Sequence, residues 1–173
     1  GTLLVTADGS DHLRGLFAQA EEIYATSSRP ISPMAYANDA NGCPVPYAAP
    51  LGHPLHRAVE RAERVLAVEE YARQAARLAE TPPDGARANG APPPVAAMAE
   101  LRLVGSDEQG WRTRAIWERD EPVLLPHADE VQVGDAVCPW PEVAARLTPA
   151  KGLEPIRWSA PHWPHPGKAG PTR

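Results

Sequence analysis

Six of the eight cysteines and histidines in this sequence fall into two groups of the same composition, and their side chains can bind transition metals. The members are Cys43, His53 and His56 in the first group and Cys138, His162 and His165 in the second. A thiolate and two neutral imidazoles can form the ligand set of zinc or another transition metal. Glu60, four residues after His56 on an expected helix, could add a fourth ligand. This pattern would make the chain a small metal-binding or metalloenzyme subunit.

The alternative interpretation gives these histidines no metal. Structural zinc sites usually contain close pairs of ligands, and neither cysteine belongs to a Cys-x-x-Cys pair. Each cysteine is followed by a proline and neither lies at a recognisable helix start, so neither is expected to be a nucleophile. The histidines also stand beside prolines, and they could pack at a contact with a protein partner.

A nucleophile, an acid and a base occur together in the stretch Asp8-Gly9-Ser10-Asp11-His12. A catalytic triad requires proximity in the fold rather than in the sequence, and no strand-elbow motif surrounds Ser10. A turn followed by a helix cap at Ser10 or Asp11 explains the stretch more simply. The sequence also contains no Gly-x-Gly-x-x-Gly or Walker-type loop for phosphate binding. We therefore expect a chain that is not catalytic on its own.

Aromatic and basic residues are interspersed near the end of the sequence. Trp158 and Trp163 lie among basic residues and prolines in the segment 146–173. Such a segment could stack on nucleic-acid bases, but the formal net charge of −5 disfavours nucleic acid as a partner. Extended proline-rich segments suit protein grooves, with tryptophan as the anchor. We therefore predict that Trp158 and Trp163 bind a protein partner.

The composition indicates a modest hydrophobic core. Only 31 of the 173 residues are Leu, Val, Ile or Phe, and 21 are proline, which removes a backbone donor and interrupts regular structure. Five tryptophans and the low net charge argue against full disorder. These features favour irregular arms that complete their fold against another protein subunit or a second copy of the chain. A self-sufficient domain with loose ends is the alternative.

Two helices are expected in the first 80 residues. Apolar residues recur at helical spacing over 12–26, and a longer helix with an alanine-rich face is expected over 54–80. The segment 27–53 contains five prolines and is predicted to be a long loop that is functional or lies on a partner. The two helices are expected to pack as a helical hairpin, with self-association through a coiled coil as the alternative.

The second half of the sequence has the period of β-strands. Apolar residues alternate over 101–104 and 111–117 around a turn, which predicts a hairpin. Further short strands are expected over 123–125 and 131–137, followed by one or two helical turns over 141–147. The run from Val131 to Val137 resembles the strand corners of many small β-barrels. The segment 148–173 contains six prolines and no periodicity, and it is expected to form an extended tail.

The expected fold is α+β. It comprises a helical region over 1–80 with its proline-rich loop at 27–53, a proline-rich linker over 81–94, a small antiparallel β unit over 95–147, with a barrel-like form as one option, and the extended C-terminal tail over 148–173. No stretch approaches the 18 apolar residues of a membrane span and no charged leader opens the sequence, so we expect no membrane partner and a cytoplasmic location. Its heavy use of Ala, Arg and Pro is typical of GC-rich bacterial genomes. The predicted function is a non-catalytic accessory or scaffold subunit of a larger bacterial protein assembly.

Overall fold

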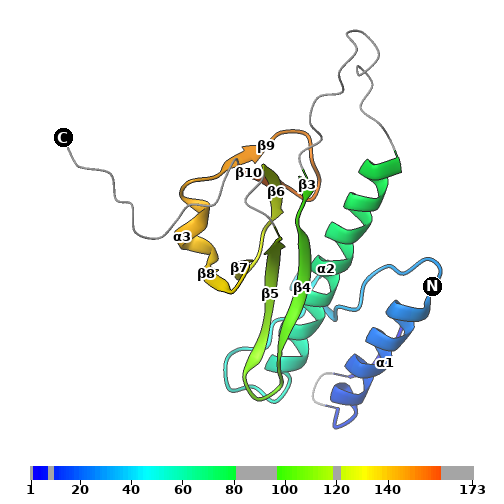
Figure 1. Ribbon diagram of the computed structural model, residues 1–173. Helices are drawn as coiled ribbons and strands as arrows, with labels where there is room; N and C mark the ends of the chain where they lie inside the picture. Colours follow the sequence, from blue (N-terminus) through cyan, green and yellow to red (C-terminus); the bar gives the residue numbers. More distant parts are fainter. Residues whose placement is uncertain (1, 8–9, 81–96, 119–121, 161–173) are drawn as a thin grey trace. The chain divides into compact units, whose positions relative to one another are not determined.

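The computed structural model describes residues 2–7, 10–80, 97–118 and 122–160. Helices and several β-sheets occur together (Figure 1), which confirms the α+β class. The chain divides into two compact units, the first formed by residues 1–69 and 103–112 and the second by residues 70–102 and 113–173. No helix in the described ranges combines the length and the apolar character that crossing a membrane requires.

In the first unit, helix α1 (Leu13–Thr26) agrees closely with the first predicted helix. The predicted loop that follows contains a small antiparallel sheet of two strands, β1 (Tyr36–Asn38) and β2 (Pro44–Pro46). The carboxylate of Asp39 organises the turn between these strands, because it accepts the N–H groups of Asn41 and Cys43 at 2.8 Å each. These hydrogen bonds lower the pKa of Asp39.

Helix α2 (His56–Glu80) organises the rest of the first unit. Arg61 binds the Glu21 carboxylate of α1 at 2.6 and 2.7 Å, and its guanidinium lies 4.0 Å from the centre of the Trp111 ring. The carboxylate of Glu60 accepts the main-chain N–H of Trp111 at 3.3 Å. The adjacent side chains of Glu60 and Arg61 on α2 therefore hold both α1 and the segment around Trp111. The buried positions at the start of the helix are Leu55, Val59 and Ala62.

Two four-stranded sheets contain all the described strands from residue 97 onward. Their strand orders are β3-β6-β10-β9 and β4-β5-β7-β8. The strands of the first sheet are β3 (Ala97–Met98), β6 (Val123–Pro126), β10 (Arg157–Ala160) and β9 (Thr148–Ala150). The strands of the second sheet are β4 (Glu100–Ser106), β5 (Gly110–Trp117), β7 (Glu130–Val133) and β8 (Ala136–Pro139). A short helix, α3 (Trp140–Ala144), follows β8.

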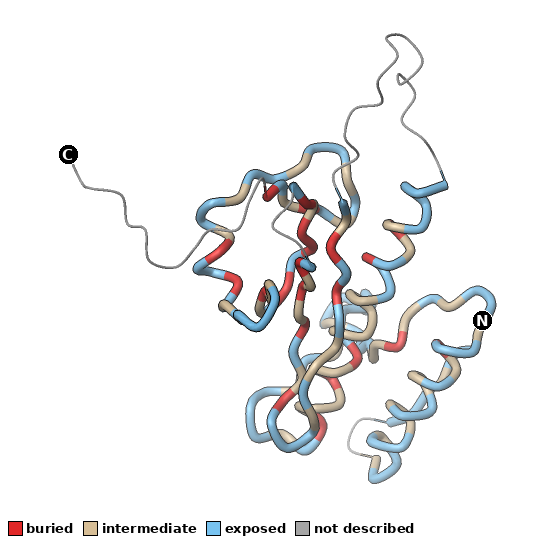
Figure 2. Tube along the Cα trace, viewed as in Figure 1, coloured by how far each residue is buried: buried red, intermediate tan, exposed pale blue. Residues whose placement is uncertain are grey.

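The core of the second unit is formed mainly by alternate residues of these strands. Thr113, Ala115 and Trp117 of β5 are buried while the residues between them are half-buried, as a strand with one inward face requires. Figure 2 shows buried positions along the central strands. Tyr71 and Gln74 of α2 are also buried in this unit, so the helix contributes polar as well as apolar groups to the core.

Two features of the predicted β unit are wrong. The sheets form no closed barrel in the part of the chain that the structure describes. Nor is the unit wholly antiparallel, because β3 pairs with β6 and β5 pairs with β7 in parallel. The chain adds β6 to the other sheet after β5 and then returns to place β7 beside β5, so β5 and β7 are not joined as a hairpin. Alternation of apolar residues marks a strand but does not reveal its neighbour.

The prediction of an extended tail from residue 148 is also wrong for its first half. Strand β10 lies between β6 and β9 and pairs with both in the antiparallel direction. The sequence did not reveal this strand because Arg157, a charged residue, occupies an inward-facing position that is 1% exposed. The rest of the predicted tail, over 161–173, and the predicted linker over 81–94 lie outside the described residues.

Candidate partner-binding site

The structure does not bring the first group of predicted metal ligands together. Cys43 is exposed between β1 and β2, whereas His53 and His56 lie at the start of α2. Nδ1 of His53 accepts the Leu55 N–H at 3.2 Å, and Nδ1 of His56 lies 2.8 Å from the carbonyl oxygen of Ala49. Among the described residues, no three His, Cys, Asp or Glu side chains form a group that could hold a metal ion.

The second predicted metal group is described only in part. Cys138 is half-buried in β8, and His162 and His165 lie outside the described residues. A metal at this group therefore stays a prediction.

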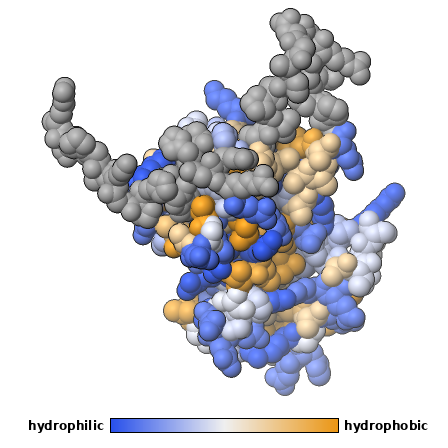
Figure 3. Space-filling view, in the orientation of Figure 1, coloured by the Kyte–Doolittle hydropathy of each residue, from blue (hydrophilic) through white to orange (hydrophobic). Residues whose placement is uncertain are grey.

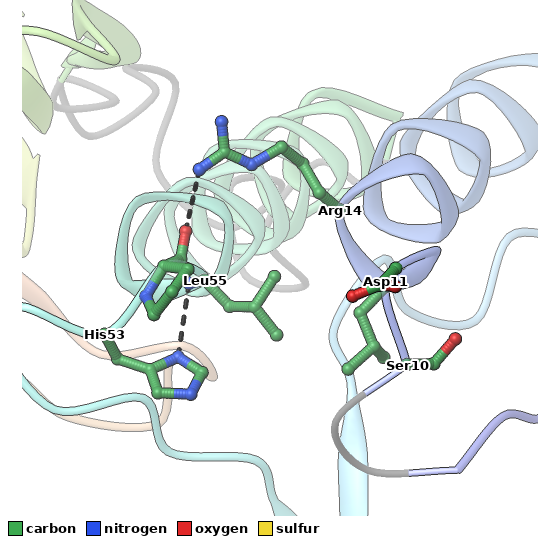
Figure 4. A pocket seen from close by; sticks show the side chains of 7 residues that line it. Ser10, Asp11, Arg14, His53 and Leu55 are labelled. Carbon is green, nitrogen blue, oxygen red and sulfur yellow. Dashed lines mark hydrogen bonds between the residues drawn. The ribbon is translucent and has the colours of Figure 1, made fainter.

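Residues at the start of α1 and directly before α2 line a hollow of about 410 Å³ in the first unit. Figure 4 shows Ser10, Asp11 and Arg14 on one side, His53 on the other, and Leu55 between them. Arg14 donates to the Pro54 carbonyl oxygen at 2.9 Å, and Nδ1 of His53 is occupied by the Leu55 N–H. Since no hydrogen bond joins Ser10 or Asp11 to His53, the hollow contains no assembled triad.

The Ser10 hydroxyl has a local role instead. It accepts the His12 N–H at 3.3 Å, and His12, not Ser10 or Asp11, is the N-cap of α1, without a side-chain capping bond. The predicted side-chain cap at Ser10 or Asp11 is therefore wrong, and the predicted turn before it includes residues 8 and 9, which lie outside the described residues.

Trp158 packs inside the second unit. Its ring lies 5.1 Å from the ring of the buried Trp140 in an edge-to-face arrangement and 5.7 Å from the ring of His127. The expectation that Trp158 belongs to an extended tail is therefore wrong, although its side chain is only half-buried. Binding of a partner by Trp158 stays a prediction, as it does for Trp163, which lies outside the described residues.

A second hollow, of about 520 Å³, opens beside α1 in the first unit. We call it the α1 hollow. Three segments line it, residues 2–7, residues 29–38 and the apolar face of α1, together with Ser27 and Tyr47. Leu13, Leu16, Phe17 and Ile23 provide much of the α1 wall. The helical spacing of these residues was recognisable from the sequence, but what they face was not.

The apolar face of α1 is incompletely covered by its own chain. Tyr24 is the one residue of α1 that is buried, and Figure 2 draws most of the helix as exposed or intermediate. A helix that belongs to a complete core normally buries its whole apolar stripe. Here that stripe lines the open α1 hollow.

Exposed apolar side chains are concentrated in the first unit. Leu3, Val5 and Ile31, which all line the α1 hollow, are 84%, 83% and 81% exposed. Fully covering a side chain of this size contributes about 1.5–3 kcal/mol. Figure 3 shows that apolar atoms also reach the surface among polar ones elsewhere. The other exposed large apolar residues of the first unit are Tyr36, Val45 and Leu51, and those of the second are Leu78, Val137 and Ile156.

Among the described residues that line the α1 hollow, Arg29 alone is charged. The Arg29 N–H donates to the Ser27 hydroxyl at 3.3 Å, but the guanidinium forms no hydrogen bond or ion pair with any residue that the structure describes. An arginine at the edge of an apolar surface can bind a carboxylate through two parallel hydrogen bonds. The site therefore combines uncovered apolar area with one free positive charge.

The sequence predicts that the segment 27–53 is functional or lies on a partner, which stays a prediction, and it did not single out Leu3, Val5, Ile31 or Arg29. Apolar residues next to prolines in a segment without periodicity were the available signal. Comparisons of the chain with family models, curated proteins and solved structures found no match.

Proposed function

We propose that this chain is a non-catalytic accessory or scaffold subunit that binds another protein through the α1 hollow. The observation that supports the proposal is that the apolar face of α1, with only Tyr24 buried, lines an open hollow whose rim carries Leu3, Val5 and Ile31, each more than 80% exposed. Exposed apolar surface that gathers in one place is typical of a protein-binding site.

The chemistry of the described residues agrees with binding better than with catalysis. The hollow that contains Ser10, Asp11 and His53 has no assembled triad, and its histidine already accepts a main-chain N–H. The described residues that line the α1 hollow include a single charged side chain, that of Arg29, and no acid–base pair. A wall that is largely apolar, with a few polar groups and one arginine among its described residues, suits recognition rather than proton transfer.

The experiment begins with a tagged chain purified from its native host and with the identification of proteins that remain bound. The candidate partner is then produced separately, and its Kd is measured by calorimetry for the wild type and for Leu3→Ser/Ile31→Ser. We expect the double variant to weaken binding by about tenfold or more, because the lost apolar burial exceeds 1.4 kcal/mol.

The matched control is Val137→Ser/Ile156→Ser, which removes two apolar side chains of the second unit that are each 42% exposed. This control should leave the Kd within about twofold of the wild type. The proposal fails if no protein binds directly, or if the control and the Leu3/Ile31 variant weaken binding equally. Circular dichroism of each variant verifies that its helices are intact.

A further inference from the structure

The register of the β1–β2 hairpin determines which backbone groups point away from it. Tyr36 is opposite Pro46, Ala37 opposite Val45, and Asn38 opposite Pro44. A proline cannot donate a ladder hydrogen bond, so Ala37 and Val45 form the hydrogen-bonded pair. The flanking bonds agree, since the Asp39 N–H donates to the Cys43 carbonyl oxygen at 2.8 Å and the Tyr47 N–H donates to the Ala35 carbonyl oxygen at 2.9 Å.

Hydrogen-bonded and non-hydrogen-bonded pairs alternate along an antiparallel ladder. The N–H and C=O groups of Tyr36 and Asn38 therefore point away from β2, along the outer edge of β1. In the described part of the chain, β2 is the sole strand that pairs with β1. β1 thus has a free edge with two donors and two acceptors.

The outer edge of β2 lacks the N–H donors that pairing with another strand would require. Pro44 and Pro46 occupy the two positions whose N–H groups would otherwise point outward, and proline has no N–H. Proline on an edge strand prevents further strand pairing. The hairpin can therefore accept a new strand on the β1 side but not on the β2 side.

The free edge of β1 belongs to the same site as the exposed apolar residues. Tyr36, Ala37 and Asn38 all contribute to the wall of the α1 hollow, and so does Arg29. An extended segment that paired with β1 would direct alternate side chains to one face of the sheet. Apolar side chains at these alternate positions match the apolar wall, and a carboxylate matches the unpaired guanidinium of Arg29.

We infer that β1 accepts an extended strand from the protein partner, with alternating apolar side chains and an acidic residue that binds Arg29. This inference rests on the proposed function and specifies how the partner binds. Strand addition combines main-chain hydrogen bonds with pockets for alternate side chains. The charge argues against a second copy of residues 2–6 as the occupant, because that apolar segment carries no acidic residue and would leave Arg29 unpaired.

The test compares Asn38→Pro with Asn38→Ala in binding to the purified partner. Asn38→Pro removes an outward N–H, as Pro44 and Pro46 do on β2, while Asn38→Ala keeps the N–H. We expect Asn38→Pro to weaken the Kd by about tenfold or more and Asn38→Ala to leave it within about twofold. Arg29→Glu should also weaken binding by about tenfold, and Arg29→Lys should weaken it less.

Hydrogen exchange measured by NMR on the wild-type chain gives a second readout, which requires no substitution. The amide protons of Tyr36 and Asn38 should exchange about tenfold or more slowly in the complex than in the free chain. Unchanged exchange of both protons overturns the inference.

Two results separate the inference from the proposed function. If Leu3→Ser/Ile31→Ser abolishes binding while Asn38→Pro binds as the wild type does, the partner uses the apolar surface without adding a strand, and only the inference fails. If no partner binds, both fail. Native mass spectrometry detects the other occupants, because a homodimer that dissociates on Asn38→Pro, or a bound small apolar molecule, would replace the partner strand and overturn the inference.

Discussion

The guanidinium of Arg157 lies 5.1 Å from the centre of the Tyr71 ring and donates a hydrogen bond to the Tyr71 main-chain oxygen at 3.1 Å. Its other acceptors are Oε1 of Gln74 at 2.6 Å and the carbonyl oxygens of Ala99 and Leu124 at 3.1 and 3.0 Å. All four acceptors are neutral, and burial lowers the pKa of Arg157. One buried cation therefore joins α2, β6 and β10 within the second unit.

Replacing Arg157 by alanine should destabilise the second unit by at least about 3 kcal/mol, because it removes four hydrogen bonds from a charged donor, three of them buried, and each such bond contributes about 1.5–3 kcal/mol. Urea unfolding followed by tryptophan fluorescence measures the free energy of unfolding. Arg102→Ala is the control, since the Arg102 side chain is 52% exposed, and it should change stability by less than about 0.5 kcal/mol. Equal effects of the two substitutions would contradict the structural role of Arg157.

Tyr71 should make the second unit less stable at alkaline pH. Its hydroxyl donates to the Ile156 carbonyl oxygen at 2.8 Å and accepts the His127 N–H at 3.1 Å. Desolvation by burial raises the pKa of Tyr71, although the His127 N–H and the charge of Arg157 act in the opposite direction. Stability is then complete below the unfolded-state pKa of about 10 and falls as the pH rises toward the higher folded-state pKa.

The measurement is the urea midpoint between pH 8 and pH 11, compared with that of Tyr71→Phe. The variant should begin at a lower stability, because it loses two hydrogen bonds, and should decline less steeply above about pH 10. The same alkaline slope in both proteins would show that Tyr71 is not the group responsible.

Truncation should distinguish the strand at residues 157–160 from the residues that follow it. Ending the chain after Gly152 removes β10 and with it Arg157, so we expect the second unit to lose its cooperative unfolding transition. Ending the chain after Ala160 retains every described strand and should leave the free energy of unfolding within about 0.5 kcal/mol of the full chain. Cooperative unfolding of the shorter chain would show that β10 is dispensable.

The same pair of truncations tests the predicted role of Trp163. If that residue anchors a partner, the chain that ends after Ala160 should remain folded but bind the partner more weakly by about tenfold, as loss of a tryptophan anchor typically does. Trp163→Ala in the full chain should reproduce most of the loss. Unchanged binding by both would confine the partner contact to residues before 161.

Glu60 should hold the tip of the β4–β5 hairpin in a pH-dependent manner. Burial by itself would raise the pKa of Glu60, but hydrogen bonds from Arg57 and the Trp111 N–H, with the charge of Arg64, outweigh it and lower the pKa. The contact is complete above the unfolded-state pKa of about 4.3 and is lost as the pH falls through the lower folded-state pKa.

Glu60→Gln removes the charge and should accelerate exchange of the Trp111 amide proton by about threefold to tenfold near neutral pH. The matched control is Glu63→Gln on the exposed side of the same helix, which should leave that exchange rate unchanged. NMR detects the amide proton directly. Equal exchange in the wild type and the Glu60 variant would contradict the role of this carboxylate.

Features of the site that depend on neighbouring residues could be predicted from the sequence. Features that depend on residues distant in the sequence could not. The apolar spacing of α1 is a local pattern, so the sequence revealed both the helix and its apolar face. The free edge of β1 depends on the register of a three-residue strand, which the turn at Asp39 and the prolines opposite β1 determine together. The unpaired state of Arg29 depends on which carboxylates the fold brings near it, and no local pattern contains that information.

The sequence by itself determined the two long helices, the hairpin around residues 106–110 and the α+β class, because each depends on the periodicity of neighbouring residues. Only the tertiary structure decided that β6 joins a different sheet from β5, and that Arg157 is buried within a strand of the core. Strand pairing brings together segments that are distant in the sequence. A buried charge is tolerated only where such segments supply enough acceptors around it.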